Sequence, residues 1–196
     1  MTTPPLPSWA NRPTPGPPAP GSPADQLLAA FVGPRWETYR RKFTPFFEDA
    51  RFTPTWNWAA ALLSPAWFLY RKLYVPFVFF AIAPSLAFSL LLGDQVPTQQ
   101  VQSPFPGGGQ VATLAPAAML VALGVLISTA ILAGGTANFL LFRRAMAAVR
   151  VVGSRAPQAD AAQTLLRRVG GTSWQAVVLG VAVMIVLRTL ASASAR

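Results

Sequence analysis

The chain has 196 residues, of which 53% are hydrophobic and only 11% are charged, a balance typical of membrane proteins rather than of soluble domains. Its 16 Lys and Arg residues exceed its 6 Asp and Glu residues by ten charges, so we expect an anionic surrounding such as lipid headgroups or nucleic acid. The sequence contains neither Cys nor His, which excludes disulfides, thiol nucleophiles, most zinc and haem sites, and the commonest general base.

The first segment, residues 1–22, is rich in proline and has no apolar stretch, so it is not a cleavable signal peptide. We expect a disordered cytoplasmic tail of polyproline II character that acts as a tether or as a docking strip. Residues 23–55 follow as cytoplasmic or interfacial helices. Ser22 and Pro23 predict the start of a short helix that ends at Gly33.

A second short helix carries Trp36, Tyr39 and Phe43 on one side, with basic residues on both flanks, which is typical of an interfacial helix. Packing of this helix against the cytoplasmic ends of membrane spans explains the pattern equally well. Because Pro45 has no N–H for a helical hydrogen bond, we expect the two phenylalanines that follow it to lie in a separate turn.

The rest of the chain, residues 56–196, is predicted to be a helical membrane domain. A helix needs about 20 apolar residues to cross roughly 30 Å of hydrocarbon. Uncharged runs place three transmembrane helices at about residues 73–93, 115–142 and 172–190. The run 56–70 is too short to cross alone and has basic residues at both ends, so we expect an interfacial or re-entrant segment with both ends on one side of the membrane.

Local signals mark the connections between these spans. Residues 95–109 contain three Pro and three Gly, which predicts a mobile loop. Gly170 and Gly171 predict the end of a short helix that begins near Pro157. Thr172 is followed three positions later by a glutamine, and this spacing predicts a capping box at the start of the third span.

Most basic residues lie in two regions, and the positive-inside rule converts this distribution into an orientation. The segment before the first span and the segment 143–168 are rich in Lys and Arg, whereas residues 94–110 contain none. Both regions therefore predict a cytoplasmic N-terminus. Arg188 and Arg196 would then lie outside the cytoplasm, a mild violation of the rule; if the third apolar segment lies in the interface, the C-terminal end is cytoplasmic instead.

A candidate lipid interface surrounds the 56–70 segment, because aromatic rings favour the headgroup level and basic side chains can reach lipid phosphate. Its residues are Trp56, Asn57, Trp58, Trp67, Tyr70, Arg71, Lys72 and Tyr74. An ordinary aromatic belt explains most of them. Asn57 is the polar exception: it either contributes to a re-entrant ligand or lipid pocket or caps the short helix.

Small residues recur every four positions in the second and third spans, a pattern that permits close approach of helix backbones. These residues are Ala130, Gly134 and Asn138 in the second span and Ala176 and Gly180 in the third. We expect the two spans to pack on each other through these faces. Alternatively, the same faces pair two copies of the chain.

Several of these residues carry a resemblance to a bacterial membrane-protein family, domain of unknown function 2628. The landmarks occur in three groups: Asn57, Trp58, Ala59, Ala60, Pro65, Trp67, Tyr70, Arg71, Lys72 and Tyr74, then Asn138 to Arg144, then Gly170, Gly171, Thr172 and Ser173. The resemblance covers roughly residues 27–190 and leaves out the proline-rich tail. It implies the bacterial inner membrane and no known activity.

The residue types argue against catalysis. No carboxylate lies inside a predicted span and His is absent, so we expect the chain not to be an enzyme and to need no cofactor or metal. Glu48 and Asp49 are adjacent, but a solvated loop pair explains them better than a metal site. The basic residues flank the spans, so we expect no nucleic-acid partner.

We therefore interpret the chain as an all-α, multi-pass protein of the bacterial inner membrane with short interfacial or cytoplasmic helices. Its basic and aromatic cytoplasmic platform is expected to contact anionic lipid headgroups and to serve as an accessory or scaffold component. The expected protein partner is another membrane protein or a second copy of the chain. A small oligomeric transporter, or a protein that binds lipid or a neutral solute, is the alternative.

Overall fold

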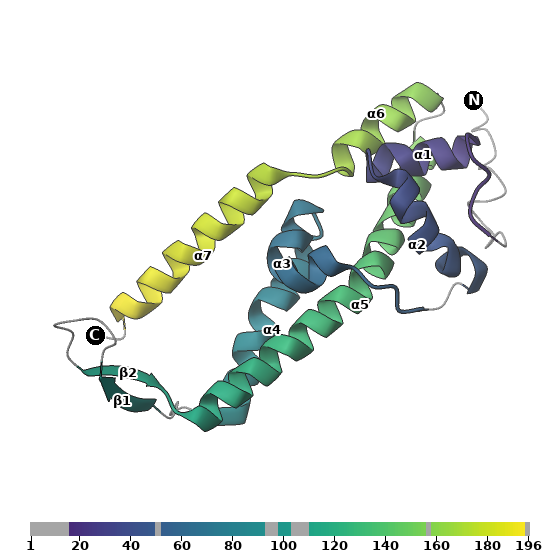
Figure 1. Cartoon of the computed structure of the whole chain (residues 1–196). Helices are drawn as coiled ribbons and strands as arrows, with labels where there is room; N and C mark the ends of the chain where they lie inside the picture. Colours follow the sequence, from purple (N-terminus) through teal and green to yellow (C-terminus); the bar gives the residue numbers. More distant parts are fainter. Residues whose placement is uncertain (1–15, 50–51, 93–97, 103–109, 156–157, 195–196) are drawn as a thin grey trace.

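The computed structural model describes residues 16–49, 52–92, 98–102, 110–155 and 158–194. Its helices are α1 (Pro23–Val32), α2 (Trp36–Asp49), α3 (Trp58–Tyr70), α4 (Tyr74–Leu92), α5 (Pro116–Arg155), α6 (Ala159–Val169) and α7 (Trp174–Ser194). An antiparallel hairpin of β1 (Thr98–Gln102) and β2 (Gln110–Leu114) separates α4 from α5. The predicted all-α class is confirmed for these residues apart from the hairpin (Figure 1).

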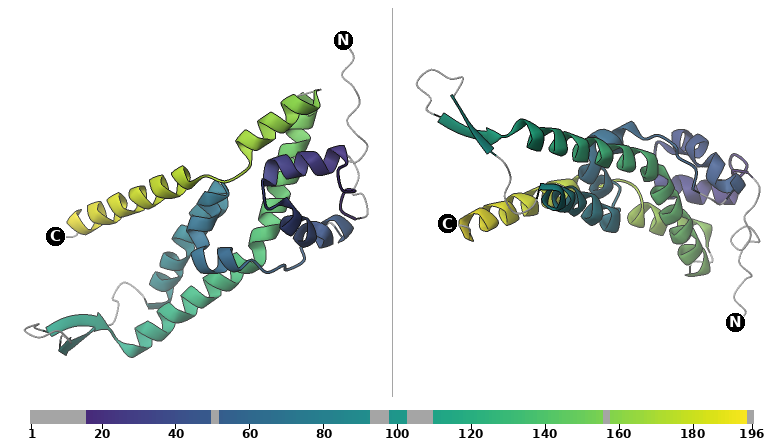
Figure 2. Two further views of the ribbon diagram at one scale, coloured as in Figure 1. Left: turned by 45° about the horizontal axis from the view of Figure 1, so that its top comes forward. Right: turned by 90° about the horizontal axis from the view of Figure 1, so that it is seen from below.

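Helix α5 connects two regions of the molecule. Helices α3 and α4 lie beside its first part, whereas α1, α2 and α6 pack around its second part, as Figures 1 and 2 show. We call α1, α2, α6 and residues Leu141–Arg155 of α5 the head. The predicted span ends at residue 142, but the helix itself continues to Arg155 because Ala145, Val149 and Val152 extend a buried apolar stripe at helical spacing.

Aromatic side chains of α2 form the centre of the head. Phe43 is fully buried, and its ring centroid lies 6.1 Å from that of Trp36, 5.7 Å from Tyr39, 6.3 Å from Phe46 and 5.4 Å from Phe142 of α5. Trp36 and Tyr39 are also buried. The aromatic stripe of this helix therefore packs inside the head, the second of the two explanations considered for it, and does not form an exposed interfacial face.

Helix α2 continues through Pro45 to Asp49, so the prediction of a separate turn after the proline is wrong. Phe46 and Phe47 are buried, with ring centroids 5.3 Å and 5.0 Å from that of Phe142. A proline inside a helix costs about 3 kcal/mol. Burying two phenylalanine side chains contributes about 1.5–3 kcal/mol each, so tertiary packing outweighs the local penalty.

Both ends of α1 lie where the sequence predicts them. Ser22 caps the helix, because its Oγ accepts a hydrogen bond from the Asp25 N–H at 3.3 Å, and proline occupies the first helical position. The helix ends before Gly33, as predicted. Both signals act within one helical turn, which is why they could be recognised without knowledge of the fold.

The junction between α6 and α7 matches the sequence prediction only in part. Helix α6 ends at the predicted pair of glycines, where the N–H of Gly171 donates to the carbonyl oxygen of Phe31 at 2.6 Å. The cap of α7, however, is Ser173 rather than Thr172, because the Ser173 Oγ accepts from the N–H of Ala176 at 3.2 Å. The predicted capping box is therefore wrong: the cap lies one residue later, and the third helical residue is then Ala176, which has no polar side chain to bond back.

The predicted loop 95–109 is wrong for residues 98–102, which form strand β1. Thr98 pairs with Leu114, and Gln102 pairs with Gln110. The strands contain β-branched residues, which favour extended backbone. The glycines and two of the prolines that predicted a loop occupy residues 103–109, and the third proline is Pro97; both lie outside the described residues.

The remaining region exposes apolar side chains. We define the apolar region as α3, α4, residues Pro116–Leu140 of α5, and α7. Within the described residues, α5 is the one helix long and apolar enough, by length and composition, to cross a membrane, and α3 and the stretch Tyr74–Phe88 of α4 are apolar but shorter. Exposed apolar side chains cover all four parts, among them Leu62, Val75, Ile82, Leu120, Leu126, Val178 and Leu179.

Candidate functional site

Two asparagines join the segment before α3 to the middle of α5. The Asn57 Nδ2 donates to the Asn138 Oδ1 at 2.9 Å, and the two side chains are 4% and 0% exposed. Asn57 also caps α3, because its Oδ1 accepts from the N–H of Ala60 at 3.2 Å. The structure therefore gives Asn57 the capping role considered for it and adds a partner 81 residues away along the chain.

The backbone of residues 52–57 is not helical, and several polar groups near its end bond to neighbouring helices. The Asn138 Nδ2 donates to the carbonyl oxygen and to the Oγ1 of Thr55, each at 3.0 Å. The Lys42 Nζ donates to the Trp56 carbonyl oxygen at 3.0 Å, and partial burial lowers the pKa of this ammonium. The Asn57 N–H donates to the Gly134 carbonyl oxygen at 2.9 Å.

Gly134 is required at this crossing. A Cβ at this position would lie 2.9 Å from the Ala61 Cβ and 3.1 Å from the Trp56 ring, closer than side chains normally approach. Trp56 and Trp58 are exposed on the outer side of the crossing, with ring centroids 5.3 Å apart. The aromatic residues at the start of α3 are therefore surface residues, whereas the glycine and asparagines beneath them are buried.

The expectation that the second and third spans pack on each other through their small residues is wrong. A Cβ at Gly134 would meet α3, and one at Gly180 of α7 would meet Leu69, also of α3. Ala130 and Ala176 are partly exposed. Helix α3 lies between α5 and α7 because it folds back beside both helices, which agrees with Figure 1 and the left view of Figure 2.

Arg71 is buried between the end of α3 and the head. Its Nη1 donates to the carbonyl oxygen of Val32 at 2.9 Å, and its guanidinium carbon lies 4.7 Å from the ring centroid of Tyr39. The side chain is 4% exposed, as is that of Trp67 in the preceding helix α3. The expectation that Arg71 reaches lipid phosphate is therefore wrong: a carbonyl and an aromatic face contact the buried guanidinium, and its Nε has no hydrogen-bond partner in the described part of the chain.

The other predicted interface residues lie around the turn that joins α3 to α4. The Lys72 Nζ donates to the Arg168 carbonyl oxygen at 2.8 Å. The Tyr70 ring centroid lies 5.1 Å from that of Trp174, at the start of α7. Tyr74 is exposed at the start of α4, and the guanidinium carbon of Arg144 lies 6.0 Å from its ring centroid. Partial burial lowers the pKa of Arg144.

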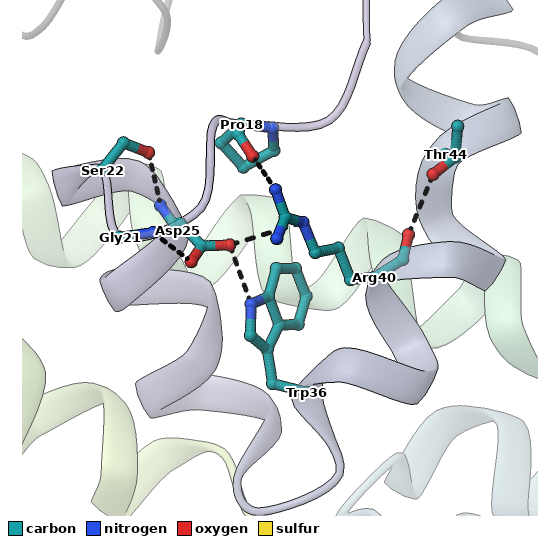
Figure 3. A network of polar contacts seen from close by, with 7 residues as sticks. All are labelled: Pro18, Gly21, Ser22, Asp25, Trp36, Arg40 and Thr44. Carbon is teal, nitrogen blue, oxygen red and sulfur yellow. Dashed lines mark hydrogen bonds and ion pairs between the residues drawn. The ribbon is translucent and has the colours of Figure 1, made fainter.

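A polar network in the head was missed by sequence analysis (Figure 3). The buried Asp25 carboxylate accepts from the Trp36 Nε1 at 2.8 Å and from the Gly21 N–H at 2.9 Å, and it lies 3.8 Å from the Arg40 Nε. Arg40 also donates to the Pro18 carbonyl oxygen at 2.7 Å, which holds the end of the predicted tail; residues 1–15 lie outside the described residues. No local spacing links Asp25 of α1 to Trp36 and Arg40 of α2.

Within the residues that the structure describes, no three potential metal ligands gather at one place. A cavity of about 570 Å³ lies between α1 and α6, with Gln26, Gln163 and Arg167 in its wall, and it includes none of the predicted interface residues. The contacts at the turn around Arg71 can fix the positions of α3 and α4 relative to the head.

Comparison with known proteins identifies a family. The family described as "Protein of unknown function (DUF2628)" matches residues 35–147. The match runs from the loop before α2 to the distal part of α5, so it contains both asparagines, Arg71 and Lys72. It is shorter than the expected resemblance and excludes the glycine landmark before α7. No curated protein and no solved structure matches the chain.

Proposed function

The chain belongs to the DUF2628 family of proteins of unknown function, and from this premise we propose that it is an accessory or scaffold protein of the bacterial inner membrane. In this proposal α4, residues 116–140 of α5, and α7 cross the bilayer. The hairpin lies on the outer side and the head in the cytoplasm. The platform that serves the partner is the head together with the turn between α3 and α4.

One observation carries the proposal: the apolar and the basic surfaces belong to different parts of the molecule. Leu90, Leu120 and Val178 are 76%, 70% and 68% exposed on three different helices of the apolar region. Exposed apolar surface costs roughly 25 cal/mol per Å² in water, and a patch that covers several helices is typical of a membrane-facing surface. In the head, by contrast, the large aromatic side chains are buried.

Charge supports the orientation. Arg143, Arg150 and Arg155 are exposed on the part of α5 that belongs to the head, and Arg167 and Arg168 are exposed on α6. The described strands of the hairpin contain no Lys or Arg. Because basic loops stay in the cytoplasm, this distribution favours a cytoplasmic head. The same residues suit anionic lipid headgroups as partners.

The scaffold role follows from the connections between the two regions. Arg71 bonds to the end of α1, and Lys72 bonds to the end of α6, so the turn between α3 and α4 is attached to the head at two points. A head attached in this way presents one fixed surface near the membrane, which suits a component that positions another membrane protein.

Single cysteines test the topology directly, because the chain contains no natural cysteine. Ser154→Cys places a thiol on the exposed surface of the head, and Gln100→Cys places one on β1. We expect a membrane-impermeant maleimide to label the second variant and not the first in intact spheroplasts, and both proteins to stay in the membrane after alkaline carbonate. Labelling of Ser154→Cys in intact spheroplasts, or extraction by carbonate, would contradict the proposal.

The role is tested by purification from mild detergent followed by mass spectrometry. Reproducible recovery of a membrane-protein partner supports the accessory role. A homo-oligomer that carries solute across liposome membranes favours the transporter alternative. Flux measurements need a control with the same lipid and an unrelated membrane protein of similar size.

A further inference from the structure

We infer that residues 52–70 form a re-entrant element, which enters the cytoplasmic leaflet of the bilayer and returns to the same side. This inference rests on the proposed function, because it presupposes that α5 crosses the membrane. The element has two parts: an extended segment, residues 52–57, and helix α3. Its surroundings are the acyl chains of phospholipids in the cytoplasmic leaflet.

The extended segment runs along α5 away from the head. Near its start, the ring centroid of Phe52 lies 5.3 Å from that of Phe139, and at its end the Asn57 N–H bonds to the Gly134 carbonyl oxygen. An α-helix rises about 1.5 Å per residue, so Gly134 lies roughly 15 Å along α5 from Arg144. This distance is about half the thickness of the hydrocarbon core.

Helix α3 then returns to the level of the basic residues. The carbonyl oxygen of Tyr70, the last residue of α3, accepts from the Ser173 N–H at 2.9 Å, just before α7 begins. Lys72 bonds to Arg168, and Tyr74 lies beside Arg144. Helix α3 has thirteen residues with a kink at Ser64, so it spans at most about 20 Å, compared with the roughly 15 Å of the return. Both ends of the element are therefore on the head side.

The polar contacts distinguish a re-entrant element from one that lies among the headgroups. In hydrocarbon, non-helical backbone is tolerated only where protein groups satisfy its N–H and C=O groups, whereas at the headgroup level water can do so. Here Asn138, fully buried within an uncharged run of α5, donates to Thr55, and Lys42 extends from the head to the Trp56 carbonyl oxygen. These contacts supply partners for the carbonyl oxygens of Thr55 and Trp56, and the Gly134 carbonyl oxygen supplies one for the Asn57 N–H, at the end of the segment that lies deepest.

The outer surface of the element suits lipid chains. Trp58, Leu62 and Leu63 are 69%, 77% and 58% exposed around the first turns of α3. The helix bends just after them, at Ser64, where the backbone has φ 23° and ψ −103°. The exposed apolar side chains continue the surface of α4 and α5, so the same lipid leaflet that covers those helices also covers the element.

Spin labels measure the depth. Leu62→Cys, labelled with a nitroxide, is reconstituted in vesicles of phosphatidylethanolamine and phosphatidylglycerol, and its collision rates with oxygen and with a water-soluble nickel chelate are compared. Labels at Leu126→Cys in α5 and Ser154→Cys in the head are the references. We expect the Leu62 label to resemble the Leu126 label, with high oxygen and low nickel accessibility.

The two possible failures are distinguishable. High nickel accessibility at Leu62, with low accessibility at Leu126, overturns the re-entrant element and leaves the proposed membrane protein intact. High nickel accessibility at both positions overturns the proposed function as well. These measurements use the otherwise unaltered chain, so they do not depend on whether a further variant folds.

A second variant tests what holds the element at depth. Asn138→Leu removes the donor to Thr55 and the acceptor for Asn57, so we expect the nickel accessibility of the Leu62 label to rise toward that of the Ser154 label. Thr136→Leu is the matched control, because its hydroxyl bonds only to the Leu132 carbonyl oxygen of the same helix, at 2.6 Å. Equal depth in both variants overturns the anchoring role of Asn138.

Discussion

Asn57 combines three contacts in one residue, and each has a different energetic basis. Its backbone N–H reaches Gly134, its Oδ1 satisfies the first turn of α3, and its Nδ2 pairs with Asn138. A buried amide left without a partner costs about 1–3 kcal/mol, whereas a lost helix cap costs typically about 1 kcal/mol. The two side-chain contributions can be separated, because serine retains the cap and cannot reach Asn138.

Substitutions of Asn57 test whether its cap and its bond to Asn138 contribute separately to stability. We expect Asn57→Ser to lower the free energy of unfolding by about 2 kcal/mol, because the Asn138 Oδ1 loses its partner. Asn57→Ala should cost about 1 kcal/mol more, because the cap of α3 is lost as well. Denaturation by SDS in mixed micelles, followed by circular dichroism, measures both values. Equal losses for the two variants would mean that the cap contributes nothing.

Among the secondary-structure elements, α2 departs most from its local signals. Pro45 removes one helical hydrogen bond, yet the helix continues because the phenylalanines on both sides of the proline pack around Phe142. Helix α3 is interrupted instead: Ser64, which precedes Pro65, adopts a backbone conformation rare for any residue with a side chain, and the helix kinks there between α5 and α7.

The Pro45→Ala variant tests whether tertiary packing keeps α2 helical despite the destabilising effect of Pro45. Alanine restores the missing hydrogen bond and favours the helix, which outweighs the greater entropy of the unfolded chain, so we expect the free energy of unfolding to rise by about 1–2 kcal/mol. Pro34→Ala, in the turn between α1 and α2, serves as the control and should bring no gain. A loss of stability in Pro45→Ala would show that the core requires the helix geometry that Pro45 imposes.

At the scale of the whole molecule, α5 belongs both to the apolar region and to the head. Its first part is surrounded by exposed apolar side chains, and its second part contributes Leu141, Ala145 and Val149 to the buried core. The two regions are stabilised in different ways: the head by burial of aromatic groups away from water, and the apolar region, in the proposed arrangement, by the bilayer. Damage to the head should therefore leave the membrane attachment intact.

Phe43→Ala tests this independence. Removing a fully buried phenylalanine costs about 3–5 kcal/mol, so we expect trypsin to cleave the head of this variant, in inverted membrane vesicles, much faster than that of the unaltered protein. The protein should remain resistant to carbonate extraction. Phe79→Ala on the exposed surface of α4 is the control and should change neither result. Release of the Phe43→Ala variant from the membrane would show that membrane attachment depends on the folded head.

Several features of the chain could be predicted because their causes are local. The uncharged run that forms α5 is a property of composition alone, and the ends of α1 at Ser22 and Gly33 depend on groups within one turn. The family landmarks around Asn57 and Arg71 are also short patterns, which is why the family could be recognised from sequence.

Tertiary structure alone decided what those landmarks contact. Asn138 was assigned to helix packing because of its spacing, but its partners are Asn57 and Thr55, more than 80 residues away. The sequence pattern predicts Arg71 at the lipid surface, yet its guanidinium is buried against the carbonyl of Val32 and the ring of Tyr39. Local patterns determine where a helix begins and how apolar it is. The groups that replace water around a buried amide or guanidinium come from distant segments, so only the folded chain identifies them.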